Sequence, residues 1–284
     1  MFLPKTNYLL LFFKWILICL IVGILAGASS SLFLYTLNVA TDFREAHLWM
    51  VFLLPIAGLA IGYLYHCYGN GVSKGNNVIL EEYEKPHTII PLKMAPMVYI
   101  GTILTHLFGG SAGREGTAVQ MSTAIADQFT GVFKLTAQER KIILIIGISG
   151  GFASVFGTPL TGAIFAIEVL YFSRVSFKSI IPSFLTAYIA YYTVEFFQIP
   201  HTYYQHPYIP ELHLELLPWL LLVGILFGLT ARMFSTSVHY FSERAKEFIS
   251  FPPLRPFIGG LIFALIIYFT GATQYLGLGI PTIL

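Results

Sequence analysis

Long apolar segments follow one another along most of the 284-residue chain. We expect membrane spans or partial spans at 8–40, 48–68, 89–109, 116–131, 141–171, 176–197, 213–242 and 255–272. A membrane helix needs about 20 apolar residues. Only 11% of the residues are charged, less than half of the roughly 25% typical of soluble domains. The sequence therefore predicts an all-α, polytopic membrane protein that lies in the lipid bilayer.

Glycine and proline interrupt several of these segments. The stretch 147–162 reads GISGGFASVFGTPLTG, which is too rich in glycine for one straight span, so we expect two short helices within 141–171. Broken helices are tolerated at membrane depth only where they are buried in protein or line an aqueous cavity. Uneven, broken helices indicate a transporter or channel, not a simple anchor.

The distribution of Lys and Arg predicts the orientation. Lys5 and Lys14 lie at the start of the first span, whereas the connection 198–214 holds no Lys or Arg. Because cytoplasmic loops carry an excess of these residues, we expect a multi-pass protein of the cell membrane with a cytoplasmic N-terminus. One cluster falls on the outer side in this scheme: Lys134, Arg140 and Lys141. A net charge of +2 is too small for a nucleic-acid partner.

The loop 109–121, GGSAGREGTAVQM, is the most informative stretch. It follows an apolar span and opens a helix-compatible run, with four glycines in its first eight residues. Glycine lets the backbone turn tightly, and a helix start offers unpaired N–H groups and partial positive charge. Such a loop predicts an anion site built from backbone. The strings GNN at 75–77 and GTPLTG at 157–162 have the same character.

Glu115 lies in the middle of this loop. A carboxylate at membrane depth costs about 2.5–3.5 kcal/mol, so a purpose or a partner is expected. One interpretation is that the carboxylate occupies the anion site and leaves it when protonated, which couples anion movement to protons. The other is a first-turn glutamate favoured by the helix dipole and paired with Arg114 in a surface loop.

An internal repeat divides the chain. Residues 22–27 read VGILAG and residues 223–228 read VGILFG, and at the same offset Pro55–Gly58 matches Pro256–Gly259. The span 176–197 adds one membrane crossing between the two copies. An odd number of crossings in the first copy predicts that the second copy is inverted in the membrane, as in many transporters. We expect 1–212 to form the first repeat, with the anion loop, and 213–284 to begin an incomplete second repeat without a counterpart of 84–190.

The loop 109–121, together with GFASVFGTPLTGAIFAIEVL at 151–170, resembles the CLC family of chloride channels and anion/proton antiporters. The resemblance implies the inverted-repeat helical CLC fold, a homodimer, and a small anion (chloride or fluoride) and protons as the transported species. It implies no cofactor. It also implies a gating glutamate at Glu115 and anion contacts from the residues Asn76, Gly113, Arg114, Gly116 and Thr117.

The sequence departs from the usual family pattern in three places. Asn76 stands where the family has an anion-coordinating serine, Thr117 replaces a proline, and Val169 replaces an inner glutamate. These departures are similar to the fluoride/proton antiporter branch. Two alternatives stay open: a passive chloride channel, and a truncated, non-transporting fragment with a structural role.

Other polar residues are expected to be structural. We expect His106 to pack between helices, although a proton relay is the alternative, and Glu168 to pair with Arg174. Asp127 is expected to cap or pair locally. Tyr203, Tyr204 and Tyr208 are typical of an interfacial aromatic belt. The histidines, among them His201, His206 and His213, show no metal-binding spacing, and no catalytic motif of a hydrolase is present, so we expect neither a metal site nor an enzyme.

Overall fold

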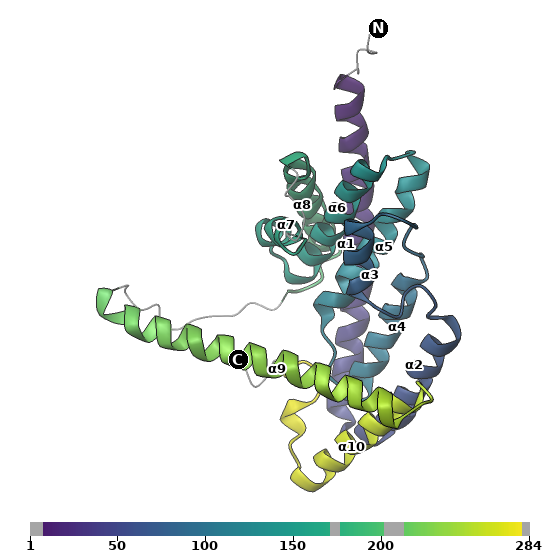
Figure 1. Cartoon of the computed structure of the whole chain (residues 1–284), viewed down its shortest axis with the longest axis vertical. Helices are drawn as coiled ribbons and strands as arrows, with labels where there is room; N and C mark the ends of the chain where they lie inside the picture. The colour runs from purple at the N-terminus through teal and green to yellow at the C-terminus, as the bar shows by residue number, and fades with distance from the viewer. Residues whose placement is uncertain (1–7, 171–176, 202–212, 280–284) are drawn as a thin grey trace.

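The computed structural model describes residues 8–170, 177–201 and 213–279 (Figure 1). The chain is all-α in this part, and its elements in order are α1 (Tyr8–Ala46), η1 (Leu48–Leu53), α2 (Leu54–Tyr68), α3 (Asn76–Glu84), α4 (Met94–Leu107), α5 (Arg114–Val132), α6 (Ala137–Phe156), α7 (Pro159–Glu168), η2 (Phe177–Ser179), α8 (Ile180–Phe196), η3 (Leu214–Leu216), α9 (Leu217–Phe248), α10 (Leu254–Thr270) and η4 (Thr273–Tyr275).

The helices are uneven in length, as predicted. Among the described residues, Leu9–Ala46, Leu48–Tyr68 and Leu214–Phe248 are long and apolar enough to cross a membrane. Shorter apolar helices lie at Met94–Leu107 and Leu254–Thr270, among others. The prediction of an all-α membrane protein with broken helices is confirmed.

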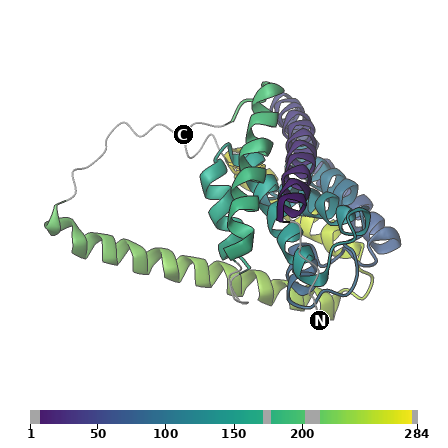
Figure 2. The ribbon, with the colours of Figure 1, turned by 90° about the horizontal axis from the view of Figure 1, so that it is seen from above.

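Helix α6 lies at the centre of the bundle. It packs against α1, α5, α7 and α8 (Figures 1 and 2). Its residues Ile143, Leu144, Ile145 and Ile146 are buried almost completely. A helix that is apolar all round is expected in such a central position, and the other helices are placed by their contacts with it.

The break predicted within 141–171 lies later than its glycine content indicated. α6 runs without interruption through Gly147 and Gly151, and the chain turns only at Gly157 (φ +69°), before α7 begins at Pro159. A Cβ at Gly147 would lie 2.7 Å from the Thr123 Cα of α5, and one at Gly151 would lie 2.6 Å from the Ala118 carbonyl oxygen. These two glycines therefore allow close helix packing and do not break the helix.

A buried polar network joins α3, α5 and α6. Arg140 of α6 donates from Nε to Asp127 Oδ1 (2.8 Å) and from Nη2 to Asp127 Oδ2 (2.7 Å). It also donates to Glu82 Oε2 (2.8 Å) and to the Thr88 carbonyl oxygen. Asp127 therefore pairs with a residue of the next helix in addition to Thr130 of its own. The orientation prediction placed Arg140 with Lys134 and Lys141 in a charged cluster on the outer side of the membrane. Arg140 is buried in this network and therefore does not act as a loop charge.

One matched pair of the internal repeat, Pro55–Gly58 and Pro256–Gly259, lies in α2 and α10, which pack side by side (Figure 1). A Cβ at Gly58 of α2 would lie 2.6 Å from the Pro256 carbonyl oxygen of α10. In return, a Cβ at Gly260 of α10 would lie 3.0 Å from the Pro55 nitrogen of α2. The two helices thus touch through their N-terminal halves.

Helix α9 extends beyond the bundle (Figures 1 and 2). None of its residues is buried, although the helix is apolar. In a bilayer, exposed apolar side chains of this kind lie against lipid chains without penalty, because lipid is as apolar as leucine.

Arg140→Met is expected to destabilise the fold by about 3–5 kcal/mol, because it leaves the completely buried Asp127 without its cation. Thermal unfolding in detergent, followed by circular dichroism, measures the change. Arg244→Met is the control, since Arg244 lies half-exposed on α9. Equal unfolding temperatures for the two variants would contradict a stabilising role of the network.

Glu82→Gln is expected to lower stability at neutral pH but not in acid. Burial by itself raises the pKa of Glu82, but hydrogen bonds from the His87 amide, Arg140 and Thr88 outweigh it and lower the pKa below its ordinary value of 4.5. Stability from a carboxylate with a lowered pKa is fully present above its unfolded-state pKa and is lost as the pH falls through the folded-state pKa.

Thermal unfolding of the wild type and Glu82→Gln over a series from neutral to acid pH tests this expectation. The two unfolding temperatures converge below pH 4.5. Glu81→Gln, at an exposed neighbouring carboxylate, serves as the control. A gap that is constant with pH would show that Glu82 does not contribute through its charge.

Candidate functional site

Two helices begin next to each other inside the bundle. α3 begins at Asn76 after Gly75, and α5 begins at Arg114 after Gly113; neither start has a side-chain cap. Gly75 has φ +59° and ψ −131°, a conformation that suits glycine. A Cβ at Gly116 would lie 3.4 Å from Asn76 Nδ2, so the first turn of α5 lies against the Asn76 side chain. The side-chain amide at the start of α3 thus lies beside the first turn of α5.

A cavity of about 160 Å³ lies at this junction. Its lining residues are Asn76, Ile79, Leu80, Glu115, Gly116, Val119, Ile148, Phe152, Phe165, Val169 and Leu170. Asn76 and Glu115 supply its polar side chains, and the remainder of the wall is apolar. Hydrogen bonds to a charged ligand are stronger beside apolar walls than in water. Asn76 is exposed, so the cavity is open on one side.

Glu115 lies in the first turn of α5, at the wall of this cavity. Its Oε1 atom is 4.0 Å from Arg114 Nε, and 42% of the side chain is exposed. An ion pair this long and this exposed contributes little. The ion pair with Arg114 that the alternative requires is therefore weak, while the carboxylate is partly exposed at the cavity wall.

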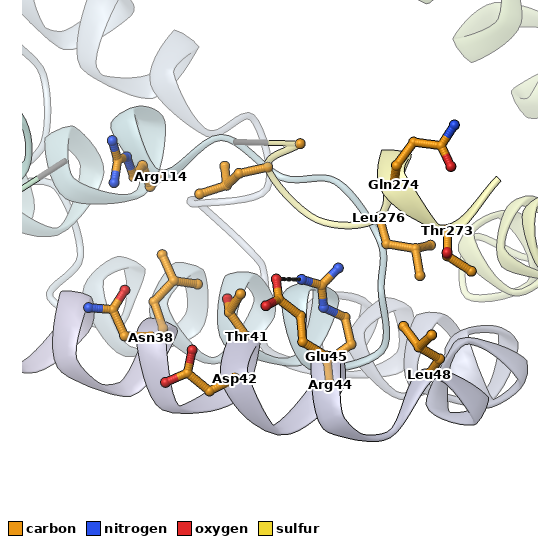
Figure 3. Close-up of a pocket in the computed structure, with 13 residues that line it drawn as sticks. Asn38, Thr41, Asp42, Arg44, Glu45, Leu48, Arg114, Thr273, Gln274 and Leu276 are labelled. Carbon is orange, nitrogen blue, oxygen red and sulfur yellow. Dashed lines mark hydrogen bonds and ion pairs between the residues drawn. The ribbon is translucent and has the colours of Figure 1, made fainter. Parts of the chain in front are cut away.

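The other predicted anion contacts lie around the cavity but do not line it. Gly113 is the N-cap of α5. Arg114 is one of the residues that line a second, larger cavity (Figure 3), and its guanidinium lies 5.8 Å from the ring centre of Phe156. Thr117 is buried, and its hydroxyl lies 2.6 Å from the Thr102 hydroxyl. Of the five predicted contacts, the structure brings Asn76 and Gly116 together with Glu115.

The string GTPLTG at 157–162 does not contribute a helix start to this cavity, and that expectation is wrong. α7 lines the cavity only through its second half, from Phe165. At its start, a Cβ on Gly157 would lie 2.8 Å from the His201 ring. The turn at Gly157 therefore packs against the segment after α8, and α7 runs with its C-terminal end towards the cavity.

Two further residues contact the anion loop and the helix starts. His106 is buried, and its Nε2 lies 2.7 Å from the Ala112 carbonyl oxygen, which fits the expected packing histidine and holds the loop before α5. Gln120 was not predicted. A Cβ on Gly75 would lie 3.4 Å from its Nε2 atom, and its spacing of four residues from Gly116 places both on one face of α5.

Some expectations fall on residues outside the described ranges. These are the partner Arg174 of Glu168, the tyrosines Tyr203, Tyr204 and Tyr208, and His206. Within the described ranges, no group of three or more His, Cys, Asp or Glu side chains is placed to hold a metal ion.

Comparisons with known proteins identify the family to which the chain is similar. Residues 57–284 match the family described as voltage gated chloride channel. The chain is 45% identical over 276 residues to the chloride/fluoride channel protein of Pseudomonas syringae pv. tomato, which covers 95% of this chain and 61% of that protein. It is 28% identical over 249 residues to the H(+)/Cl(−) exchange transporter ClcA of Vibrio cholerae, covering 81% of this chain and 52% of the transporter. The chain thus spans less than two thirds of the length of these relatives.

Solved structures show the same relationship. The crystal structure of a CLC-type fluoride/proton antiporter matches with a TM-score of 0.89 and 32% identity, over 96% of this chain and 69% of the other. That of a slow cyanobacterial Cl−/H+ antiporter matches with a TM-score of 0.74 at 18% identity, over 89% of this chain and 63% of the other. The family match, the identity to these relatives and the shared fold together establish that this chain is an integral membrane protein of the voltage-gated chloride channel, or CLC, family.

Proposed function

We propose that this chain forms part of a CLC-type pathway that moves a small anion, fluoride or chloride, across the membrane in exchange for protons. The observation that carries the proposal is the meeting of Asn76, Glu115 and Gly116 at one cavity between the starts of α3 and α5. The names of the relatives support the substrates: one is a chloride/fluoride channel protein, and one matched structure is a fluoride/proton antiporter.

The proposed anion site uses neutral donors. A partly dehydrated halide accepts hydrogen bonds from the first amides of α5, around Gly116, and from the side-chain amide of Asn76. The positive ends of the two helix dipoles favour the negative charge. The described residues that line the cavity include no Lys or Arg, so binding to them stays weak enough for release, as conduction requires.

Glu115 is the proposed gate and proton carrier. Its carboxylate and the anion compete for the same donors, because both are negative and both reach the start of α5. Protonation removes the charge, so the neutral side chain leaves the donors and the anion replaces it. When the proton leaves, the carboxylate returns, and one residue thereby couples the movements of anion and proton in opposite directions.

Fluoride is the proposed preferred substrate. Asn76 presents two N–H donors where the usual family pattern has a serine hydroxyl with one. Fluoride is the smaller and more strongly hydrated halide, so it gains more from additional donors when it loses water. Chloride in a passive channel is the second candidate, and it differs by the absence of coupled proton movement.

The proposal extends to assembly. The segment 213–284 begins an inverted second copy of 1–212, and the close contact between the starts of α2 and α10 is compatible with that arrangement. The N-terminus is cytoplasmic, and two copies of the chain form a homodimer. Proximity labelling of an N-terminal tag in intact cells and crosslinking in the membrane test these two statements.

Glu115→Gln is expected to abolish proton movement coupled to the anion, because an amide cannot carry a proton or restore the negative charge. Liposomes containing the purified protein are loaded with fluoride or chloride, and external pH and halide are followed together. Glu247→Gln, at an exposed carboxylate on α9, is the control. Unchanged proton flux in Glu115→Gln would remove Glu115 from the mechanism, and absence of flux in every variant would favour a structural role.

Asn76→Ser is expected to lower the ratio of fluoride to chloride flux at least about fivefold, the factor that roughly 1 kcal/mol of lost hydrogen bonding represents. The same liposomes measure the initial rates of both halides. The adjacent Asn77 does not line the cavity, so Asn77→Ser is the matched control. An unchanged ratio in Asn76→Ser would show that Asn76 does not select the anion.

A further inference from the structure

A second cavity, of about 420 Å³, lies at the C-terminal end of α1 (Figure 3). It is enclosed by α1, the start of α5 and the segment 273–279 that follows α10. It shares no lining residue with the cavity at Glu115. Arg114 and Glu115 are neighbours in the first turn of α5, yet Arg114 lines one cavity and Glu115 lines the other.

Arg44 in this cavity is a buried cation with few partners. The residue is 4% exposed, and to other described residues its guanidinium donates one hydrogen bond, from Nη2 to Glu45 Oε1 at 2.9 Å. Its Nε has no partner within the described residues. Arg140 is equally buried but makes four hydrogen bonds. A guanidinium has five N–H donors, and buried charged donors without acceptors are unfavourable.

The charges in the cavity are separated by depth. Arg44 is buried, and only 14% of the Arg114 side chain is exposed. The two acidic residues of the wall, Asp42 and Glu45, are both exposed, with 52% of the Glu45 side chain accessible. Solvent screens exposed charges more strongly than buried ones. The two least exposed of these charges are therefore both positive, although the four charges sum to zero.

The neighbouring groups suit a small hydrogen-bonded ligand. Asn38 and Thr41 of α1 and Thr273 and Gln274 of the later segment complete the polar wall. A Cβ on Gly277 would lie 3.0 Å from Arg44 Nη1, so this glycine lets the segment 273–279 close over the guanidinium. The Ser111 hydroxyl donates to the Gly277 carbonyl oxygen at 2.8 Å, which ties that segment to the anion loop.

We propose that this cavity is a second anion-binding site, centred on Arg44, with Arg114 in its wall. It holds a halide by charge-assisted hydrogen bonds from the guanidinium, and Glu45 competes with the halide for the same donors. The choice of a halide as the ligand rests on the proposed function. The existence of the site rests on the buried Arg44 guanidinium, whose Nε has no hydrogen-bond partner within the described residues. A halide held here lies on the other side of the first turn of α5 from the Glu115 cavity.

Bromide is the probe for this site. Crystals of the protein soaked in sodium bromide are expected to show an anomalous peak within hydrogen-bond distance of the Arg44 guanidinium. Calorimetric titration in detergent with sodium bromide and sodium fluoride then gives the Kd for each variant. Glu45→Gln removes the competing carboxylate and is expected to tighten binding about fivefold, a change of roughly 1 kcal/mol, while Arg44→Lys weakens it and removes the peak.

The controls separate this site from the site at Glu115. Glu45 is exposed, so Glu45→Gln tests the proposal even if a change at Arg44 prevents folding. Glu247→Gln leaves the affinity unchanged, and the bromide peak at Arg44 persists in Glu115→Gln. Absence of that peak, equal affinity in Glu45→Gln and the wild type, or binding of inorganic phosphate but not halide would each overturn the proposal. None of these results depends on the proton fluxes that test the proposed function.

Discussion

The close approach of α5 to α6 determines where the site lies. Gly147 and Gly151 present no side chain to α5, so the backbones of the two helices touch near Thr123 and Ala118. A methyl group at either glycine would overlap α5 and push it outward. Because α5 is held against α6, its first turn lies at the wall of the cavity that Glu115 and Gly116 line.

Polar contacts place the second helix start relative to the first. α3 is short, and its last turn is held through Glu82 by Arg140, which also binds Asp127 of α5. One guanidinium therefore links both helices whose starts form the cavity. In a low-dielectric interior, such a fully bonded network is rigid and directional. The distance between Asn76 and Glu115 thus depends on charges located at the other ends of α3 and α5.

The first turn of α5 separates two environments of different character. On one side, Glu115 and neutral donors face a small cavity with apolar walls. On the other side, Arg114 and Arg44 face a larger cavity with a polar wall (Figure 3). A cation beside a cavity attracts anions, whereas neutral donors bind them weakly. Adjacent residues of opposite charge therefore lie at two different cavities on one helix start, and the two proposed anion sites rest on this difference.

The sequence by itself determined the membrane class, the approximate helices, the anion loop with Glu115 and the two matched segments of α2 and α10, because each is a local or periodic pattern. Tertiary structure decided which loop residues reach the cavity. Thr117 is buried against Thr102, the start of α7 packs on His201, and Gly147 and Gly151 bind α5 closely without ending a helix. The partners of Arg140 and the closure of Gly277 over Arg44 join residues far apart in the chain, and no local pattern contains that information.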